Sequence, residues 1–336
     1  MMKFYKLMFT LTMIMGTLIT ISSYSWMSMW MGLEINLLSI IPLLKSMNNQ
    51  FPAESAFKYF IIQSIASTSF LFSMILNYNL IEQLNNFFNL TINIIFYASI
   101  LTKIGAAPFH AWFPEVLEGL SWSKCFIMLT WQKIAPMIII LQNFKFNFMM
   151  LIIIMLSSFT GSILGLNQIS LRKIMAYSSI NHISWMLASI PSTKIIWLMY
   201  FLIYTMISLV IILTLNYMKL YFFHQLGFLK NNKILNMLLS LNFLSLGGLP
   251  PFLGFFPKWL TINFLILNNN FFIALMLIIF TLISLFIYTR ITFSSLTLLN
   301  KDYQMKEITK PTLWLIQLNF LILSSLLLCP IMFNYF

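Results

Sequence analysis

Residues 97–115 read YASILTKIGAAPFHAWFPE, an apolar stretch that holds Lys103 and, a few residues later, Gly105 and Pro108. A charged amine is costly in apolar surroundings, and proline lacks the backbone N–H that the interior of a helix requires. The stretch GGLPPFLGFFPK at 247–258 repeats this combination of glycine, proline and lysine. The fold therefore has to explain why charges and helix breaks occur together.

The composition around these stretches is typical of a membrane protein. The chain has 336 residues, of which 60% are hydrophobic and 8% are charged, whereas about a quarter of the residues in soluble domains are charged. Runs of about 20 apolar residues, long enough to cross a bilayer as a helix, recur along the chain, and lipid-exposed backbone favours helices over open strands. We predict an all-α polytopic membrane protein, a single transmembrane domain over 1–336, with eleven helices at about 4–21, 24–44, 57–79, 90–115, 122–142, 149–169, 174–191, 195–217, 234–264, 272–294 and 313–333.

The net charge of +12 follows from the basic residues of the predicted loops. With these eleven helices, fourteen of the 19 Lys and Arg residues fall on the side of the N-terminus, and only Lys145 and Lys194 fall on the other side. Basic loops remain on the cytoplasmic or matrix side of a membrane. We therefore predict the N-terminus on that side and the C-terminus on the opposite side, with no role for the charge in binding nucleic acid.

Residues that bind cofactors are sparse. Cys125 and Cys329 are far apart, and the three histidines have no histidine partner at i+4, which argues against metal, haem and iron–sulfur sites. Neither a GxGxxG nor a Walker motif occurs among the ten glycines, so no nucleotide site is indicated. We expect no cofactor in this chain, and any redox chemistry would belong to partners.

Four ionisable residues lie well inside the predicted spans, namely Glu34, Lys103, Lys133 and Lys258. Each charge at the middle of a bilayer costs about 2.5–3.5 kcal/mol. Lys103 and Lys133 lie roughly 15 Å from either end of their spans at 1.5 Å per residue, which is too far for a lysine side chain to reach the surface. Charges at these positions therefore need surroundings that offset the free-energy cost of burying them.

Lysine chemistry suggests what that environment does. Burial favours the neutral amine, and a nearby carboxylate favours the ammonium, so a lysine between these influences can exchange a proton, which arginine cannot. We predict a proton relay through Glu34, Lys103, Lys133 and Lys258. Two alternatives remain open: side chains that snorkel to the surface, and a static ion pair between Glu34 and one lysine.

Glycine and proline predict interruptions in the fourth and ninth helices. The residues involved are Gly105, Pro108, Gly247, Gly248, Pro250 and Pro251. Non-helical backbone at membrane depth is tolerated where it is buried or lines a wet cavity, and paired interruptions are typical of inverted-repeat transporters. We predict inverted repeats of five helices at about 1–145 and 146–295, followed by an extra helix at 313–333. A plain proline kink is the alternative for each break taken alone.

Two histidines are secondary candidates for the relay. His110 lies two residues after Pro108, where water could enter, and it could instead be a structural histidine. His182 belongs to the seventh predicted helix and could connect the two halves or serve packing alone.

Five segments resemble, in order, the mitochondrially encoded subunit 2 family of NADH–ubiquinone oxidoreductase (respiratory complex I), which belongs to the antiporter-like membrane proteins. The segments are WMGLEINLLSIIPLL, LTKIGAAPFHAWFPEVLEGL, LTWQKIAP, NQISLRKIMAYSSINHISW and LGGLPPFLGFFPKW. The likeness covers about 1–300. Bacterial relatives carry three additional N-terminal helices, so we expect other subunits or lipids to fill that flank.

The resemblance implies a proton-pumping module in the membrane arm of complex I, in the mitochondrial inner membrane, with the N-terminus in the matrix and the C-terminus in the intermembrane space. It implies that Glu34 pairs with Lys103, that Lys133 is the central relay lysine and that Lys258 is the terminal one. Quinone reduction elsewhere in the complex would drive the pump. NADH, FMN, iron–sulfur clusters and ubiquinone would be bound by the parent complex and not by this chain.

The partners implied by the resemblance are other membrane-arm subunits, including neighbouring antiporter-like ones, together with lipids, protons and internal water. Two other functions remain as alternatives. One is a free-standing secondary cation/proton antiporter of the same fold, and the other is a membrane scaffold with a frozen network of ion pairs.

Overall fold

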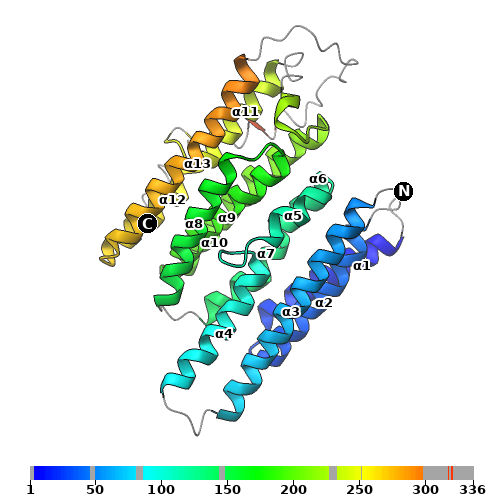
Figure 1. Ribbon diagram of the computed structural model, residues 1–336, viewed down its shortest axis with the longest axis vertical. Helices are drawn as coiled ribbons and strands as arrows, with labels where there is room; N and C mark the ends of the chain where they lie inside the picture. The colour runs from blue at the N-terminus through cyan, green and yellow to red at the C-terminus, as the bar shows by residue number, and fades with distance from the viewer. Residues whose placement is uncertain are drawn as a thin grey trace. The chain divides into compact units, whose positions relative to one another are not determined.

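The computed structural model describes residues 4–45, 50–80, 86–143, 148–226, 233–250, 252–297, 317, 319 and 320. Within these ranges the chain forms thirteen named α-helices, α1 to α13, and no strand beyond an isolated bridge between Ser170 and Phe222. The chain divides into two compact units, Met1–Met149 and Met150–Phe336. Figure 1 colours unit 1 from blue to cyan and unit 2 from green to orange.

The helices of unit 1 are apolar and pack with their neighbours in the sequence. Their bounds are α1 Phe4–Ser22, α2 Trp26–Leu44, α3 Phe51–Leu80, α4 Asn86–Ile104, α5 Trp112–Gly119, α6 Trp122–Leu129 and α7 Trp131–Gln142. α1 packs on α2, α2 on α3, and α3 on both α4 and α5. Figure 1 shows α1, α2 and α3 side by side.

Helix α9 forms the centre of unit 2. The remaining helices are α8 Phe148–Leu166, α9 Leu171–Ser189, α10 Lys194–Tyr217, α11 Lys233–Gly247, α12 Phe255–Leu267 and α13 Phe271–Thr297. α9 packs against α10, α12 and α13, and most of its residues are buried. Because α9 is surrounded by other helices and not by lipid, polar residues along it, such as His182, can bond to side chains of those helices.

The prediction of an all-helical polytopic fold is confirmed. Each of the first ten predicted spans corresponds to one helix or to a pair of consecutive helices. Within the described residues, seven helical segments are long and apolar enough to cross a membrane. The predicted helix at 313–333 and Pro251 lie outside the described residues, apart from the helical positions 317, 319 and 320.

Glycines allow two pairs of helices to approach closely. A Cβ on Gly16 of α1 would lie 2.9 Å from the backbone nitrogen of Asn36 on α2. A Cβ on Gly161 of α8 would lie 2.7 Å from the backbone nitrogen of Asn181 on α9. Small residues permit such contact between helix backbones in membrane proteins, so the first two helices of each unit are held together in a similar way.

The predicted interruptions of the fourth and ninth helices are present. α4 ends before Gly105, which has a φ of +80°, and α5 begins at Trp112. α11 ends before Gly248, which has a φ of +78°, and α12 begins at Phe255. A positive φ is strained for residues that carry a Cβ, so glycine allows the chain to leave the helix at both points.

A third interruption, at Thr130, divides the predicted span 122–142 into α6 and α7. Thr130 has a φ of −118° and a ψ of −69°, and its hydroxyl donates to the carbonyl oxygen of Phe126 over 2.7 Å. Pro136 lies in the second turn of α7 and lacks the N–H that would bond four residues back. The missing bond loosens the helix close to the interruption.

Candidate functional site

Lys103 and Glu34 lie in the interior of unit 1. Lys103 is in the last turn of α4, directly before the break, and is 7% exposed. Glu34 of α2 is half-buried, and its Oε1 is buried without a hydrogen-bond partner among the described residues. Glu34 is the carboxylate that interacts electrostatically with Lys103, yet the ion pairs of the described residues do not include a direct contact between them.

A small polar cavity adjoins Lys103. Its volume is about 10 Å³, and its lining includes Asn36 of α2, Tyr59 and Gln63 of α3, and Gln132 of α7. A cavity of this size accommodates about one water molecule if it offers two to four polar partners. The side chain of Gln63 donates from Nε2 to the carbonyl oxygen of Lys103 over 3.3 Å, which satisfies a carbonyl group that the break would leave exposed.

Lys133 lies in the first turn of α7, directly after Gln132, and is 1% exposed. Its Nζ is 5.4 Å from the ring centroid of Phe113 on α5. A cation over an aromatic ring is attracted by the negative face of the ring. The ring of Phe113 also lies against Gly105, so the break between α4 and α5 places an aromatic residue between the two lysine-bearing helices.

Lys258 occupies the second break, in unit 2. Its Nζ donates to the carbonyl oxygens of Gly247 and Leu246 over 2.9 and 3.3 Å. The ammonium group therefore caps the C-terminal end of α11, where the helix dipole favours a cation. The Nζ atom also lies 5.8 Å from the ring of Trp185 on α9, and the side chain is 6% exposed.

The two breaks align without a gap, GAAPFHAWFPE at 105–115 with GLPPFLGFFPK at 248–258. They share the first glycine with its positive φ, one Pro-Phe pair (108–109 and 251–252) and one Phe-Pro pair (113–114 and 256–257). Lys258 occupies the position of Glu115, which is exposed and pairs with Lys58 over 3.2 Å. In both units the break therefore begins at a glycine with a positive φ. The last aligned residue is the acidic Glu115 in unit 1 and the basic Lys258 in unit 2.

The two candidate histidines differ in their surroundings. His110 is half-buried in the turn between α4 and α5. His182 of α9 is 6% exposed, and its Nδ1 lies 2.9 Å from the hydroxyl of Tyr200 on α10. Its ring also packs at 5.0 Å from the ring of Tyr204. His182 therefore has a defined hydrogen-bond partner in the core of unit 2.

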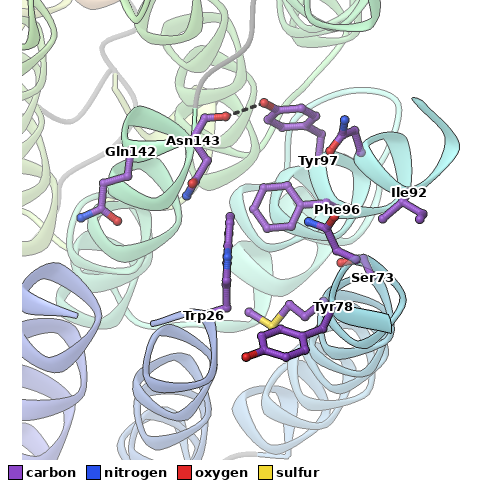
Figure 2. Close-up of a pocket in the computed structure, with 11 residues that line it drawn as sticks. Trp26, Ser73, Tyr78, Ile92, Phe96, Tyr97, Gln142 and Asn143 are labelled. Atoms are coloured by element: carbon purple, nitrogen blue, oxygen red, sulfur yellow. Dashed lines mark hydrogen bonds between the residues drawn. The ribbon is translucent and has the colours of Figure 1, made fainter. Parts of the chain in front are cut away.

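A second, larger cavity in unit 1 has a volume of about 480 Å³ and is lined by other residues. It lies between the start of α2, the end of α3, the middle of α4 and the end of α7 (Figure 2). Trp26, Phe96 and Tyr97 supply aromatic lining, and Tyr97 donates a hydrogen bond of 2.6 Å to the carbonyl oxygen of Asn143. No charged side chain lines it, so this cavity is separate from the lysine sites.

The sequence analysis did not identify Asn36, Tyr59, Gln63 or Gln132. All four are polar residues inside apolar spans, and that was the only available signal. Within the described residues, no group of three or more His, Cys, Asp or Glu residues is placed to hold a metal ion.

Comparisons with known proteins agree with this architecture. The family model described as NADH:quinone oxidoreductase/Mrp antiporter, transmembrane, matches residues 23–284. NADH-ubiquinone oxidoreductase chain 2 of Anopheles gambiae is 47% identical over 325 residues, which cover 95% of this chain and 92% of that protein. NADH-ubiquinone oxidoreductase chain 2 of Mus musculus is 39% identical over 310 residues, which cover 90% of this chain and 89% of that protein.

Solved structures share the fold at low sequence identity. A chain of respiratory complex I from Thermus thermophilus superposes with a TM-score of 0.87 at 21% identity, over 97% of this chain and 78% of that one. A chain of the Mrp complex from a Dietzia species superposes with a TM-score of 0.80 at 13% identity, over 96% and 75%. From the family model and the curated relatives together, this chain belongs to the NADH:quinone oxidoreductase/Mrp antiporter transmembrane family, in the branch of the NADH-ubiquinone oxidoreductase chain 2 proteins.

Proposed function

We propose that the chain is a proton-translocating membrane subunit of NADH:ubiquinone oxidoreductase in the mitochondrial inner membrane. Its partners are the other membrane-arm subunits of that complex. NADH, FMN, iron–sulfur clusters and ubiquinone are bound elsewhere in the parent complex and not by this chain. Quinone reduction elsewhere supplies the driving force. Moving one charge against the membrane potential requires about 2.3 kcal/mol per 100 mV.

The observation that carries this proposal is the setting of Lys103. The amine is buried at a helix break, next to a cavity the size of one water molecule and within electrostatic reach of Glu34. A carboxylate that interacts with the amine without a direct ion pair can change its influence when either group moves or changes its protonation state. A frozen ion pair offers no such freedom, which favours the relay over the scaffold.

In this mechanism a proton passes along Glu34, Lys103, Lys133 and Lys258, with His110 and His182 as secondary members. At the second break, the carbonyl groups of Leu246 and Gly247 at the end of α11 hold the side chain of Lys258, because both carbonyl oxygens accept hydrogen bonds from its ammonium group. We assign Lys258 the terminal position, as the family resemblance implies. The repeats at about 1–145 and 146–295 are inverted with respect to each other.

Two variants test the relay in the assembled complex. Glu34→Gln removes the acidic partner, and Lys103→Met removes the exchangeable proton while it keeps the aliphatic volume. Because a positioned proton-transfer group contributes on the order of a hundredfold or more to such a step, we expect Lys103→Met to abolish the proton translocation that depends on this chain. If both variants assemble and translocate the full number of protons per electron, the relay is wrong and the scaffold is supported.

The free-standing antiporter is tested separately by mass. The membrane is solubilised in a mild detergent, and the chain is detected after native electrophoresis. We expect it to migrate with an assembly many times heavier than its own 39.3 kDa. Migration of the folded chain alone would support the antiporter.

A further inference from the structure

Three polar side chains, Asn36, Tyr59 and Gln132, form a hydrogen-bonded cluster beside Lys103, which we call the amide cluster. Gln132 Nε2 donates to Asn36 Oδ1 over 2.9 Å, and Asn36 Nδ2 donates back to Gln132 Oε1 over 3.2 Å. The hydroxyl of Tyr59 also donates to Gln132 Oε1 over 3.2 Å. The cluster joins α2, α3 and α7 around the small cavity that Lys103 lines.

The position of the amide cluster along the chain relates it to the charged residues. Asn36 lies two residues after Glu34 on α2, and Gln132 lies directly before Lys133 on α7. The reciprocal amide pair therefore ties the helix that carries the acid to the helix that carries the next lysine. Unit 2 has a comparable bond, because Asn181 of α9 donates to the hydroxyl of Ser284 on α13 over 3.1 Å.

The chemistry of the cluster suits a lysine that changes its charge. An ammonium group has three donors and no acceptor, whereas amide and hydroxyl groups can both donate and accept. A neutral amine can accept a hydrogen bond, so its surroundings must reverse at least one bond when the proton leaves. A single water molecule can make this reversal by rotating, provided that fixed polar groups hold it in place.

We propose that the amide cluster holds one internal water molecule against Lys103, and that Gln132 is the positioning residue of this site. The inference rests on the proposed function and specifies how Lys103 takes part in it. When the ammonium group releases its proton, the proton passes to the water, which releases another proton to the next acceptor. The amine and the water are then both neutral, and the cluster keeps the water in place for the reverse step.

The test compares two substitutions at one position in the assembled complex. Gln132→Leu fills the space with an apolar side chain, which removes the amide of Gln132 as a polar partner of the water and leaves Asn36 and Tyr59 without their bonds to it. Gln132→Ser leaves a hydroxyl and room for a second water molecule. We expect proton translocation per electron to fall clearly for the leucine variant and to remain near the wild-type value for the serine variant.

If proton translocation falls more for Gln132→Ser than for Gln132→Leu, Gln132 serves packing, because serine leaves a larger void than leucine and voids destabilise a protein. Gln142→Leu is the matched control, since it makes the same change at the exposed end of the same helix. We expect this control to translocate normally. Equal, normal translocation by both Gln132 variants, or a loss in Gln132→Ser alone, overturns the inference.

Lys103→Met, measured alongside, separates this inference from the function on which it rests. If Lys103→Met stops translocation and Gln132→Leu does not, only the role of the amide cluster is wrong. If neither variant has an effect, the proposed relay fails as a whole. A structure of the intact complex with ordered water resolved gives a second readout: a water bonded to Lys103 and Gln132 supports the inference, and direct contact between these side chains overturns it.

Discussion

Gly248 and the side chain of Lys258 occupy adjoining space, so backbone and site depend on each other there. A Cβ on Gly248 would lie 2.8 Å from Cδ and 3.0 Å from Nζ of Lys258. We predict that Gly248→Ala displaces the ammonium group from the carbonyl oxygens of Leu246 and Gly247. The positive φ adds a cost of about 1–2 kcal/mol. The melting temperature of the assembled complex and its proton translocation should both fall.

The neighbouring glycine provides the control for this prediction. A Cβ on Gly247 would meet its nearest neighbour, Cδ2 of Tyr288, at 3.4 Å, which is ordinary van der Waals contact. Glycine in the middle of a helix costs about 0.5–1 kcal/mol relative to alanine, and at Gly247, the last residue of α11, the gain from alanine is at most of this size. Gly247→Ala should therefore be neutral or stabilising. If the two alanine variants behave alike, the left-handed backbone at Gly248 does not determine the position of Lys258.

The sequence revealed the charged residues of the site but not their polar surroundings. Lys103, Lys133 and Lys258 were recognisable because a charge in an apolar span is costly. An amide costs much less, so Gln132 did not differ from the many polar residues that bond only to their own helix. Its partner Asn36 lies 96 positions away, and such a contact depends on the packing of α2 against α7, which local pattern does not specify.

At the scale of the helices, the two predicted breaks begin at glycines with a positive φ, whereas some prolines lie inside continuous helices. Pro42 lies inside α2 without ending it, and Pro136 lies inside α7. The chain leaves the helix at Gly105 and Gly248, where a positive φ is available. The interruption at Thr130 was missed because the prediction searched for glycine and proline together, and Thr130 is followed by a proline only six residues later.

The close contact between α8 and α9 gives a prediction at this scale. A Cβ on Gly161 would lie 2.7 Å from the backbone nitrogen of Asn181 and 2.9 Å from the backbone oxygen of Tyr177. Because neither backbone atom can move without its helix, we expect Gly161→Ala to separate the helices and to destabilise the assembled complex by about 1–3 kcal/mol. A thermal melt of the complex measures the effect.

Gly165, one turn later on α8, is the control for helix packing. A Cβ there would meet Cδ1 of Ile287 at 2.9 Å, the flexible tip of a side chain, and Cβ of Tyr177 at 3.4 Å. Ile287 can adopt another rotamer, so Gly165→Ala should cost much less than Gly161→Ala. An equal cost for both variants would show that the backbone contact between α8 and α9 is not what limits stability.

At the scale of the whole molecule, the distribution of basic residues predicts which loops face the matrix. Helix α2 is 19 residues long, which corresponds to about 28 Å at 1.5 Å per residue, close to the thickness of the hydrocarbon layer. The predicted orientation places Tyr24, before α2, in the intermembrane space. It places Gln50, after α2, in the matrix. Both residues are exposed in unit 1.

Cysteine labelling tests this orientation. Tyr24→Cys and Gln50→Cys are made separately in a Cys329→Ser background, and Cys125 remains because it is buried. Mitochondria with an opened outer membrane are treated with a maleimide that does not cross membranes. We expect Tyr24→Cys to be labelled at once and Gln50→Cys only after detergent opens the inner membrane, because the positive-inside rule keeps the basic loops in the matrix.

The labelling pattern also bears on the relay, because Glu34 lies near the middle of α2. If opposite ends of α2 are labelled from opposite sides, the carboxylate lies near the middle of the bilayer, where an acid needs a functional or structural partner. Reversed labelling would mean that basic loops do not set the orientation of this chain. Labelling of both cysteines from outside would mean that α2 does not span the membrane, and Glu34 would then lose its place in the proton path.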